Sequence, residues 1–393
     1  MLPNKNQESE TMAKVTVNGK VLEWAREIRG LTLDDAAERL GIPSSDLLGY
    51  ESGATKPLVS LLRKMSAKYR INFSSLLMPE PLPPTKRPTD HRRRFGRKRL
   101  SLETLVAIEQ INEALEAFDD ISSDIRSIVP RLKIGTAKLT DNPAEVAAHE
   151  RKRFDVSIME QRGWNGLAGA RRKWREHIED RGVFTYMMSL PYKELSGFSI
   201  LHDDLAAICV NDSEPTEGAK IFTLFHEYCH LLLRNAGISD NNDKTRVERF
   251  CNQFAASFLI PRGDLMDAIS RCVGGVDTPY EFSDTHVKQL AGWFRVSNRA
   301  IALRLEKTGL APVGFYAKRT APWDIPNPPK PVPVDSKRQV SAVRIHLKRI
   351  GHLHASTVLE AVKRNAINSL DASELFGMQL RPNTVKSIEA ALE

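Results

Sequence analysis

The apolar positions of the first eighty residues recur at three- and four-residue spacing, which predicts several short helices. Glycines follow the predicted segments, where a left-handed residue ends a helix without strain. Thr32 suits the N-cap of the second helix, and Ser44 or Ser45 suits that of the third. The pattern predicts an all-helical domain over residues 19–80, after a polar and disordered stretch at residues 1–18.

Strand-like patterning is concentrated in the middle of the chain. Three short apolar runs predict strands at Gly182–Met187, Ser199–Leu201 and Ala206–Val210. The apolar run Ile221–Leu233 then predicts a buried helix, and the polar segment Asn235–Lys244 a loop. This part of the chain is therefore expected to be α+β, with a small sheet.

Proline-rich stretches divide the chain into domains. They predict extended linkers at residues 81–100, which also carry a basic run, and at residues 320–337. Residues 101–135 predict an amphipathic helix that packs on its own domain or pairs as a coiled coil. The mixed domain spans residues 140–318, and residues 338–393 form a C-terminal helical module. The predicted fold class is multidomain and mainly α.

Composition narrows the class of protein. The chain has 393 residues and a formal net charge of +8, which permits nucleic-acid contact without requiring it. None of its four cysteines forms a Cys-x-x-Cys pair. They are expected to be free, buried thiols, as is usual in proteins of a reducing cytoplasm. There is no apolar run long enough to span a membrane and no signal-peptide pattern. We therefore predict a cytoplasmic protein without membrane contact.

The buried helix carries a candidate metal site. His226 and His230 are four residues apart, so a helix places both imidazoles on one face, as a tetrahedral zinc ion requires. Glu227 lies beside them and can take a proton from a metal-bound water. This is the H-E-x-x-H arrangement of zinc peptidases. The alternative interpretation is a core helix with two hydrogen-bonded histidines.

A second predicted helix supplies a third ligand. Glu248 is a polar residue in an apolar, helix-spaced segment that stops at Pro261. Its carboxylate would complete a His₂Glu set with one open position, the catalytic type of zinc site. Asn252 lies one turn further and can orient a ligating histidine. The alternatives are a solvated Glu248 charge, or a sulfur ligand from Cys229 or Cys251.

These two segments together resemble the ImmA/IrrE zinc metallopeptidases. The pattern H-E-x-x-H-L-L-L is followed by E-x-x-x-N-x-F-A-A-x-x-L-x-P, from Glu248 to Pro261. The resemblance implies a gluzincin-like core, one Zn²⁺ per chain held by His226, His230 and Glu248, and Glu227 as general base. Known members cleave repressor proteins, so it also implies a protein substrate. Gluzincins often have Asp where Asn252 stands, and Asn lacks that charge.

The N-terminal helices resemble the XRE or lambda-repressor-like helix-turn-helix family. Residues from Glu51 to Pro57 match its E-x-G-x-x-x-P segment. The third helix offers Ser44 and Ser45 but no Arg, Lys, Asn or Gln for bidentate base contacts. The candidate DNA contacts are Ser44, Ser45, Arg92, Arg93 and Arg94. The alternative is a dimerisation or partner-binding module.

Together these features predict a cytoplasmic zinc endopeptidase fused to a helix-turn-helix domain. The family resemblance implies that the substrate is a repressor or other regulatory protein, cleaved in a stress or mobile-element response. Expected partners are this substrate, DNA through the N-terminal domain, and a second copy of the chain in a homodimer. One alternative is a DNA-binding transcription regulator whose peptidase fold is a sensor or scaffold. Another is a zinc amidase that acts on small molecules.

Overall fold

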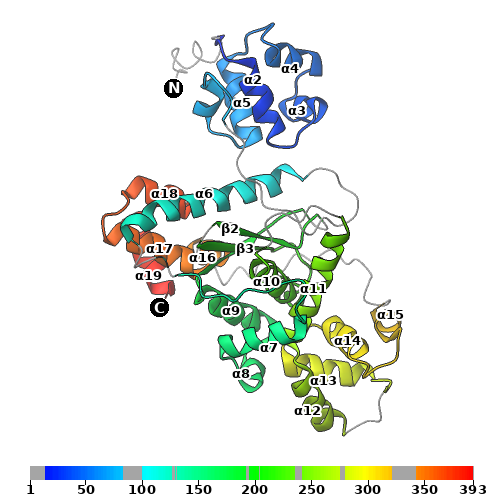
Figure 1. The fold of residues 1–393 in the computed structure, drawn as a ribbon. Helices are drawn as coiled ribbons and strands as arrows, with labels where there is room; N and C mark the ends of the chain where they lie inside the picture. The colour runs from blue at the N-terminus through cyan, green and yellow to red at the C-terminus, as the bar shows by residue number, and fades with distance from the viewer. Residues whose placement is uncertain are drawn as a thin grey trace, which may run out of the picture. The chain divides into compact units, whose positions relative to one another are not determined.

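The computed structural model describes residues 14–82, 100–125, 129, 131–191, 194–202, 204–234, 241–274, 279–320 and 342–392. Within this range the chain forms two compact units that divide inside one helix, at Ile111 and Asn112. Most of both predicted linkers lies outside the described residues. So do Arg92, Arg93 and Arg94. Figure 1 shows the elements of each unit.

The first unit contains a bundle of short helices. Its elements are α2 (Gly19–Glu27), α3 (Leu33–Leu40), α4 (Ser44–Glu51), α5 (Val59–Tyr69) and the 3₁₀ helix η1 (Phe73–Leu77). Thr32 caps α3 in a capping box with Asp35, and Gly41 ends it at φ 61°, as predicted. The predicted cap of α4 is wrong, because Pro43 is its N-cap residue and Ser44 lies within the first turn.

A buried ion pair joins α2 to α4. The Arg26 guanidinium donates to both carboxylate oxygens of Glu51, at 2.8 and 2.9 Å. Gly19 lets the two helices approach closely, because a Cβ there would lie 2.2 Å from the Glu51 carbonyl oxygen. The bidentate geometry compensates part of the cost of burying both charges. The acidic residue of the helix-turn-helix segment thus has a structural role.

Helix α6 (Leu102–Ile125) is shorter than predicted. Residues 131–138 have no regular secondary structure, so the predicted helix over residues 101–135 extends too far. A proline at position 130 cannot donate a helical hydrogen bond, which disfavours a longer helix. Leu132 and Ile134 pack against the core of the second unit instead. Apolar spacing alone did not distinguish this packed segment from a helix.

The second unit is built around a three-stranded sheet. Its strands β1 (Val183–Met188), β2 (Gly197–His202) and β3 (Leu205–Asn211) lie in the order β1-β3-β2. β1 pairs with β3 in parallel, and β2 pairs with β3 antiparallel. All three predicted strands are confirmed. β2 is at an edge, since β3 is the strand it pairs with among the described residues.

Helices cover both faces of this sheet (Figure 1). Val183 and Met187 of β1 belong to the large core formed with α9 (Gly166–Glu179) and α10 (Glu217–Leu232). Phe184, on the opposite face, stacks on Phe118 of α6 at 4.9 Å between ring centroids. Because both faces are buried, β1 is a continuous apolar run with little alternation.

Further helices complete the second unit. Before the sheet come α7 (Pro143–Phe154) and α8 (Ile158–Gly163); after α10 come α11 (Asn241–Leu259), α12 (Arg262–Val273), α13 (Asp284–Phe294), α14 (Asn298–Lys307) and α15 (Phe315–Thr320). The predicted loop at Asn235–Lys244 is partly wrong, because α11 begins at Asn241. Polar residues at a helix start resemble a loop in sequence. The helix-turn-helix-like spacing of apolar residues from His286 to Leu305 corresponds to α13 and α14.

The C-terminal module consists of α16 (Ala342–Ile350), α17 (His352–Lys363), α18 (Ser369–Phe376) and α19 (Pro382–Leu392). It packs on the rest of the second unit through buried polar groups. The Glu179 carboxylate accepts from the backbone N–H groups of His352 and Leu353, at 3.0 and 3.1 Å. A carboxylate is favourable at this helix N-terminus. Gly351 (φ 83°) is required here, because a Cβ would lie 2.3 Å from that carboxylate.

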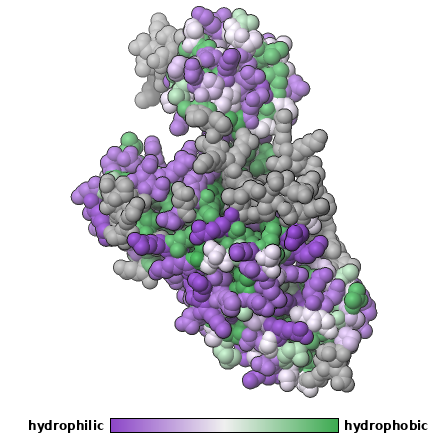
Figure 2. All heavy atoms as spheres, viewed as in Figure 1, coloured by the Kyte–Doolittle hydropathy of each residue, from purple (hydrophilic) through white to green (hydrophobic). Residues whose placement is uncertain are grey.

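The surface shown in Figure 2 mixes hydrophilic and hydrophobic residues. No helix in the described part of the chain combines the length and apolar character needed to cross a membrane.

Candidate metal centre

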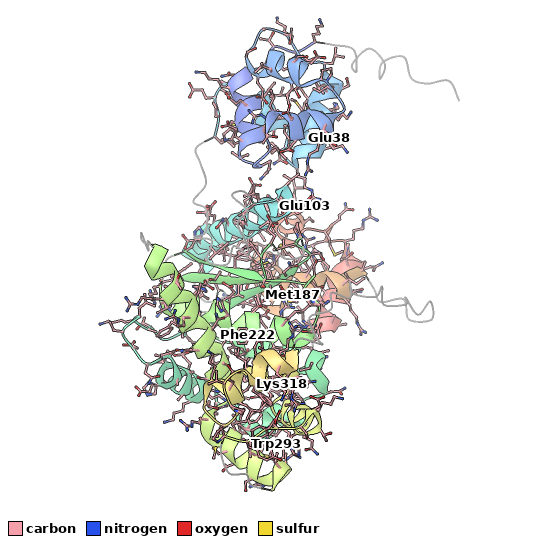
Figure 3. The ribbon with its side chains drawn as sticks, turned by 90° about the vertical axis from the view of Figure 1, so that its right-hand side faces the viewer. Glu38, Glu103, Met187, Phe222, Trp293 and Lys318 are labelled. Carbon is pink, nitrogen blue, oxygen red and sulfur yellow. The ribbon has the colours of Figure 1, made fainter. Side chains whose placement is uncertain are left out.

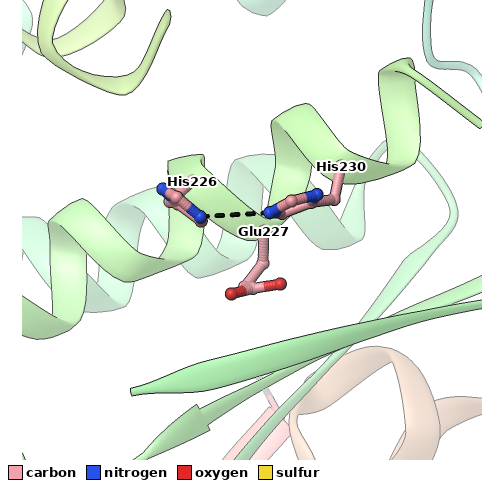
Figure 4. A group of neighbouring side chains, drawn as sticks. All are labelled: His226, Glu227 and His230. Carbon is pink, nitrogen blue, oxygen red and sulfur yellow. Dashed lines mark hydrogen bonds between the residues drawn. The ribbon is translucent and has the colours of Figure 1, made fainter. Parts of the chain in front are cut away.

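Helix α10 presents two imidazoles side by side. Thr216 caps its N-terminus, and almost every residue along it is buried. Nε2 of His226 lies 3.1 Å from Nε2 of His230, one turn further on (Figure 4). Both side chains are almost fully buried, at 0% and 3% exposed for the two residues. The predicted convergence of these histidines is present in the structure.

Glu248 on α11 faces both rings. Its Oε2 lies 3.4 Å from Nε2 of His226, and its Oε1 lies 3.4 Å from Nε2 of His230. The side chain is 26% exposed, so one side of the cluster faces an opening. Two consecutive helices, α10 and α11, therefore bring two nitrogens and a carboxylate together.

The spacing of these donor atoms fits a metal ion. Tetrahedral zinc with ligand bonds of about 2.0–2.1 Å holds its ligand atoms about 3.3 Å apart. Here the two Nε2 atoms are 3.1 Å apart, and each lies 3.4 Å from a different oxygen of the Glu248 carboxylate. Two imidazole nitrogens and one carboxylate are also the donor set of catalytic zinc sites. The residues present thus match the ion in both distance and chemistry.

Each histidine also has a partner of its own on α11. Nδ1 of His226 lies 3.0 Å from Oδ1 of Asn252, which orients the ring and keeps Nε2 facing the cluster. His230 interacts with the side chain of Cys251 on α11. Cys251 was considered only as a metal ligand at the sequence level. Cys251 lies three residues after Glu248, a spacing that favours a shared helix face. This spacing could have indicated that Cys251 lies beside the histidines.

The acidic groups around the two histidines stabilise positive charge at the cluster. Burial alone would raise the pKa of Glu248, but the two histidines outweigh it and lower the pKa to about 2. Burial alone would lower the pKa of His230, but Cys251, Glu248 and Glu227 raise it to about 10. A divalent cation would satisfy the same preference.

Glu227 occupies a different side of the cluster. Its carboxylate points toward the strands and away from the helix (Figure 4). Ser199 of β2 donates a hydrogen bond to it at 3.2 Å. It still lies near the rings, since donor atoms of His226, Glu227 and His230 are within 4.8 Å of one another. Both carboxylates are thus close, but Glu248 is the one that contacts each Nε2 within 3.4 Å.

Close packing holds Glu227 under the sheet. Gly197 of β2 lies against α10, where a Cβ would be 2.6 Å from Cγ2 of Thr223 and 3.3 Å from Cγ of Glu227. Neither Gly197 nor Ser199 was assigned a role in the site at the sequence level, because strand-to-helix contacts leave no local spacing signal. These two positions fix the distance between the edge strand and the carboxylate.

Other predicted positions lie elsewhere. The hydroxyl of Tyr228, which follows Glu227 on α10, donates to Glu150 at 2.7 Å within the core and does not contact the cluster. In the first unit, the Ser44 hydroxyl donates to Asp34 at 2.6 Å, whereas Ser45 is exposed. The Ser44 hydroxyl therefore joins α4 to α3.

Comparison with known families agrees with both resemblances. Residues 178–306 match the IrrE N-terminal-like domain of peptidase family M78, and residues 22–76 match a helix-turn-helix domain. The chain joins a helix-turn-helix domain to an IrrE-type peptidase domain. The IrrE-type match covers the three strands and α10 to most of α14, the elements that form the candidate metal centre. No individually curated protein matches the chain.

The IrrE-type match supports a metallopeptidase-type enzyme, and the helix-turn-helix match supports DNA binding. The matched segments leave the C-terminal helices α16 to α19 outside both families. The architecture is that of a protease joined to a regulatory domain.

Proposed function

We propose that this chain is a zinc-dependent endopeptidase that cleaves a regulatory protein, with a repressor as the expected substrate. The observation that carries the proposal is the position of Glu248, 3.4 Å from each of the two Nε2 atoms. Two histidines that only stabilised the core would not require a carboxylate from a second helix at 3.4 Å from both rings. The intact His₂Glu set is the catalytic type of zinc site.

His226, His230 and Glu248 would hold one zinc ion. Asn252 would keep the His226 ring oriented, and Cys251 would do the same for His230. When bound, zinc supplies Lewis acidity toward the peptide carbonyl and lowers the pKa of a coordinated water. Both rings are buried, so they would exclude water from their side of a bound ion and strengthen these effects.

Glu227 would act as the general base. Its carboxylate takes a proton from the attacking water and returns it to the amine that leaves. Ser199 orients the carboxylate through its hydrogen bond at 3.2 Å. Because Glu227 is 1% exposed, few solvent waters compete for its oxygens.

The edge strand β2 offers a way to hold an extended substrate. Its partner among the described strands is β3, on one side only. A peptide that adds to the other edge would run past Ser199, whose hydroxyl contacts Glu227. Main-chain hydrogen bonds along that edge would bring a peptide bond to the metal centre. A substrate complex with the peptide away from β2 would exclude this arrangement.

A cleavage assay tests the proposed function. The zinc-loaded full chain is incubated with the proteins encoded beside it, and products are identified by mass spectrometry. Cleavage by the wild type and its loss in Glu227→Gln, with zinc retained, supports an endopeptidase. Turnover of small amides with no protein cleavage would favour an amidase. Operator binding without any hydrolysis would favour a transcription regulator.

A further inference from the structure

A cavity of about 580 Å³ lies beside the candidate metal centre. It is bounded by α10, α11 and α14, all within the second unit. Its lining residues are Phe222, Thr245, Glu248, Arg249, Asn252, Gln253, Ala256, Leu303, Arg304 and Lys307. Its volume is within the range of binding pockets for a large side chain or a short peptide segment.

The cavity and the metal centre share residues. Glu248 contributes to both, and Asn252 contacts His226 from the cavity side. Phe222, labelled in Figure 3, lies one turn before His226, and the two ring centroids are 6.4 Å apart. A ligand in the cavity would therefore touch the neighbours of the reacting atoms. Glu227, which is held by β2, does not line the cavity.

The surface of the cavity is mainly apolar. Phe222, Ala256 and Leu303 are each partly exposed and line it from three different helices. Water in contact with such a surface is displaced favourably by an apolar side chain. A strongly hydrophilic small ligand would gain little from these walls.

Positive charge accompanies this apolar surface. Arg249, Arg304 and Lys307 all line the cavity. None of the three forms an ion pair with another described residue. Arg304 is partly buried and donates to the Ile260 carbonyl at 3.0 Å. Burial lowers the pKa of Arg304 to about 10, so the guanidinium is still charged at neutral pH. The acid of the cavity, Glu248, faces the histidines.

We propose that this cavity selects substrates by an apolar side chain with an acidic residue next to it. The apolar group enters between Phe222 and Leu303, and the carboxylate pairs with Arg249 or Lys307. Charge complementarity favours this peptide over one with a basic neighbour. The inference rests on the proposed function, because it describes the substrate of the same site.

Direct binding tests the inference without catalysis. The probes are two fluorescein-labelled hexapeptides, Gly-Ala-Leu-Glu-Ala-Gly and its counterpart with Lys in place of Glu. Anisotropy is measured on the zinc-loaded full chain carrying Glu227→Gln. We expect the Glu peptide to bind about tenfold more tightly than the Lys peptide. The double change Arg249→Glu and Lys307→Glu should reverse this order. Equal binding of both peptides, or a preference that survives the double change, overturns the inference.

A matched control separates local from general charge effects. Lys288 is an exposed lysine of α13 that does not line the cavity. Lys288→Glu should keep the preference for the Glu peptide unchanged. If Lys288→Glu abolishes it as well, the preference reflects overall charge and the inference fails. Zinc content and thermal melting of each variant report whether the fold is retained.

Cleavage of a randomised decapeptide library distinguishes the two proposals. We expect the wild type to enrich an apolar residue beside Asp or Glu on one side of the cut. Cleavage without acidic enrichment contradicts the cavity inference and leaves the peptidase proposal standing. Absence of any cleavage, together with tighter binding of the Glu peptide, contradicts the peptidase proposal and leaves the binding preference standing.

Discussion

The Ser199 hydroxyl on β2 donates a hydrogen bond to Oε2 of Glu227 on α10, at 3.2 Å. This contact joins the edge strand to the carboxylate proposed as general base. It gives the strand two roles in the proposed mechanism, because the same edge would receive the substrate. A hydroxyl that stabilises the ionised carboxylate also fixes which oxygen faces the metal centre.

Replacing the hydroxyl tests this role. Ser199→Ala should lower kcat by about tenfold, because a hydrogen bond to a charged group that positions the base is lost. Zinc content should stay at the wild-type value, and Ser199→Thr should recover part of kcat. The readout is kcat on a cleaved peptide, with zinc measured on the same sample. Equal kcat in Ser199→Ala would show that Glu227 is oriented without Ser199.

Gly197 is expected to tolerate no side chain. A Cβ there would lie 2.6 Å from Cγ2 of Thr223 and 2.7 Å from the Cys209 carbonyl oxygen. Gly197→Ala should therefore lower the free energy of unfolding by about 1–3 kcal/mol through overpacking. The matched control is Gly263→Ala in α12, where no atom lies within 4 Å of the added Cβ. Urea unfolding measures both, and equal stability of the two variants would contradict the contact.

His354 should make stability depend on pH. Tyr186 contacts its Nδ1 at 2.9 Å, and Nε2 donates to the Leu375 carbonyl at 2.9 Å. Burial lowers the pKa of His354 from 6.5 to about 4, so the folded state keeps the ring neutral. The unfolded chain then binds the proton first as pH falls. Stability from this group is present above pH 6.5 and is lost progressively toward pH 4.

The magnitude of this loss follows from the difference between the two pKa values, and it is about 3 kcal/mol. His354→Gln can keep both hydrogen bonds without titrating, so its stability should fall less between pH 6.5 and 4. His149→Gln, at an exposed position of α7, is the control and should follow the wild type. Parallel curves for His354→Gln and the wild type would contradict the assignment.

Asn252 should control metal affinity without binding the metal. Its Oδ1 lies 3.0 Å from Nδ1 of His226. Asn252→Asp adds a charge that makes the ring a stronger donor, and zinc affinity should rise about tenfold. Asn252→Leu removes the acceptor and should lower affinity by a similar factor. Competition with a chelator measures both, and unchanged affinity in both variants would contradict this role.

Residue spacing predicted one half of the candidate site. The separation of four between His226 and His230 is a local property of a helix, so sequence alone placed both rings on one face. The approach of Glu248 depends on how α11 packs against α10. It was predicted from a polar position in an apolar helix, and the family resemblance then implied the same ligand. Ser199 was missed because its contact crosses from a strand to a helix that is distant along the sequence.

The fold was predictable where patterns are local and less so at element ends. Capping by Thr32 and the stop at Gly41 follow from side-chain and backbone chemistry within one turn. The end of α6 and the start of α11 were mispredicted, because tertiary packing and polar first turns decide them. The cavity lined by Phe222 and Lys307 had no sequence signal, since three separate helices form it.

Zinc stoichiometry of the full chain tests the central claim most directly. Purified wild type and variants are dialysed against buffer with trace zinc, and bound metal is measured by mass spectrometry. We expect one zinc per chain in the wild type and in Glu227→Gln, because that carboxylate is not a proposed ligand. His230→Ala should bind none, and Glu248→Gln should bind much more weakly. A wild type without zinc, or His230→Ala with a full equivalent, would contradict the metal centre.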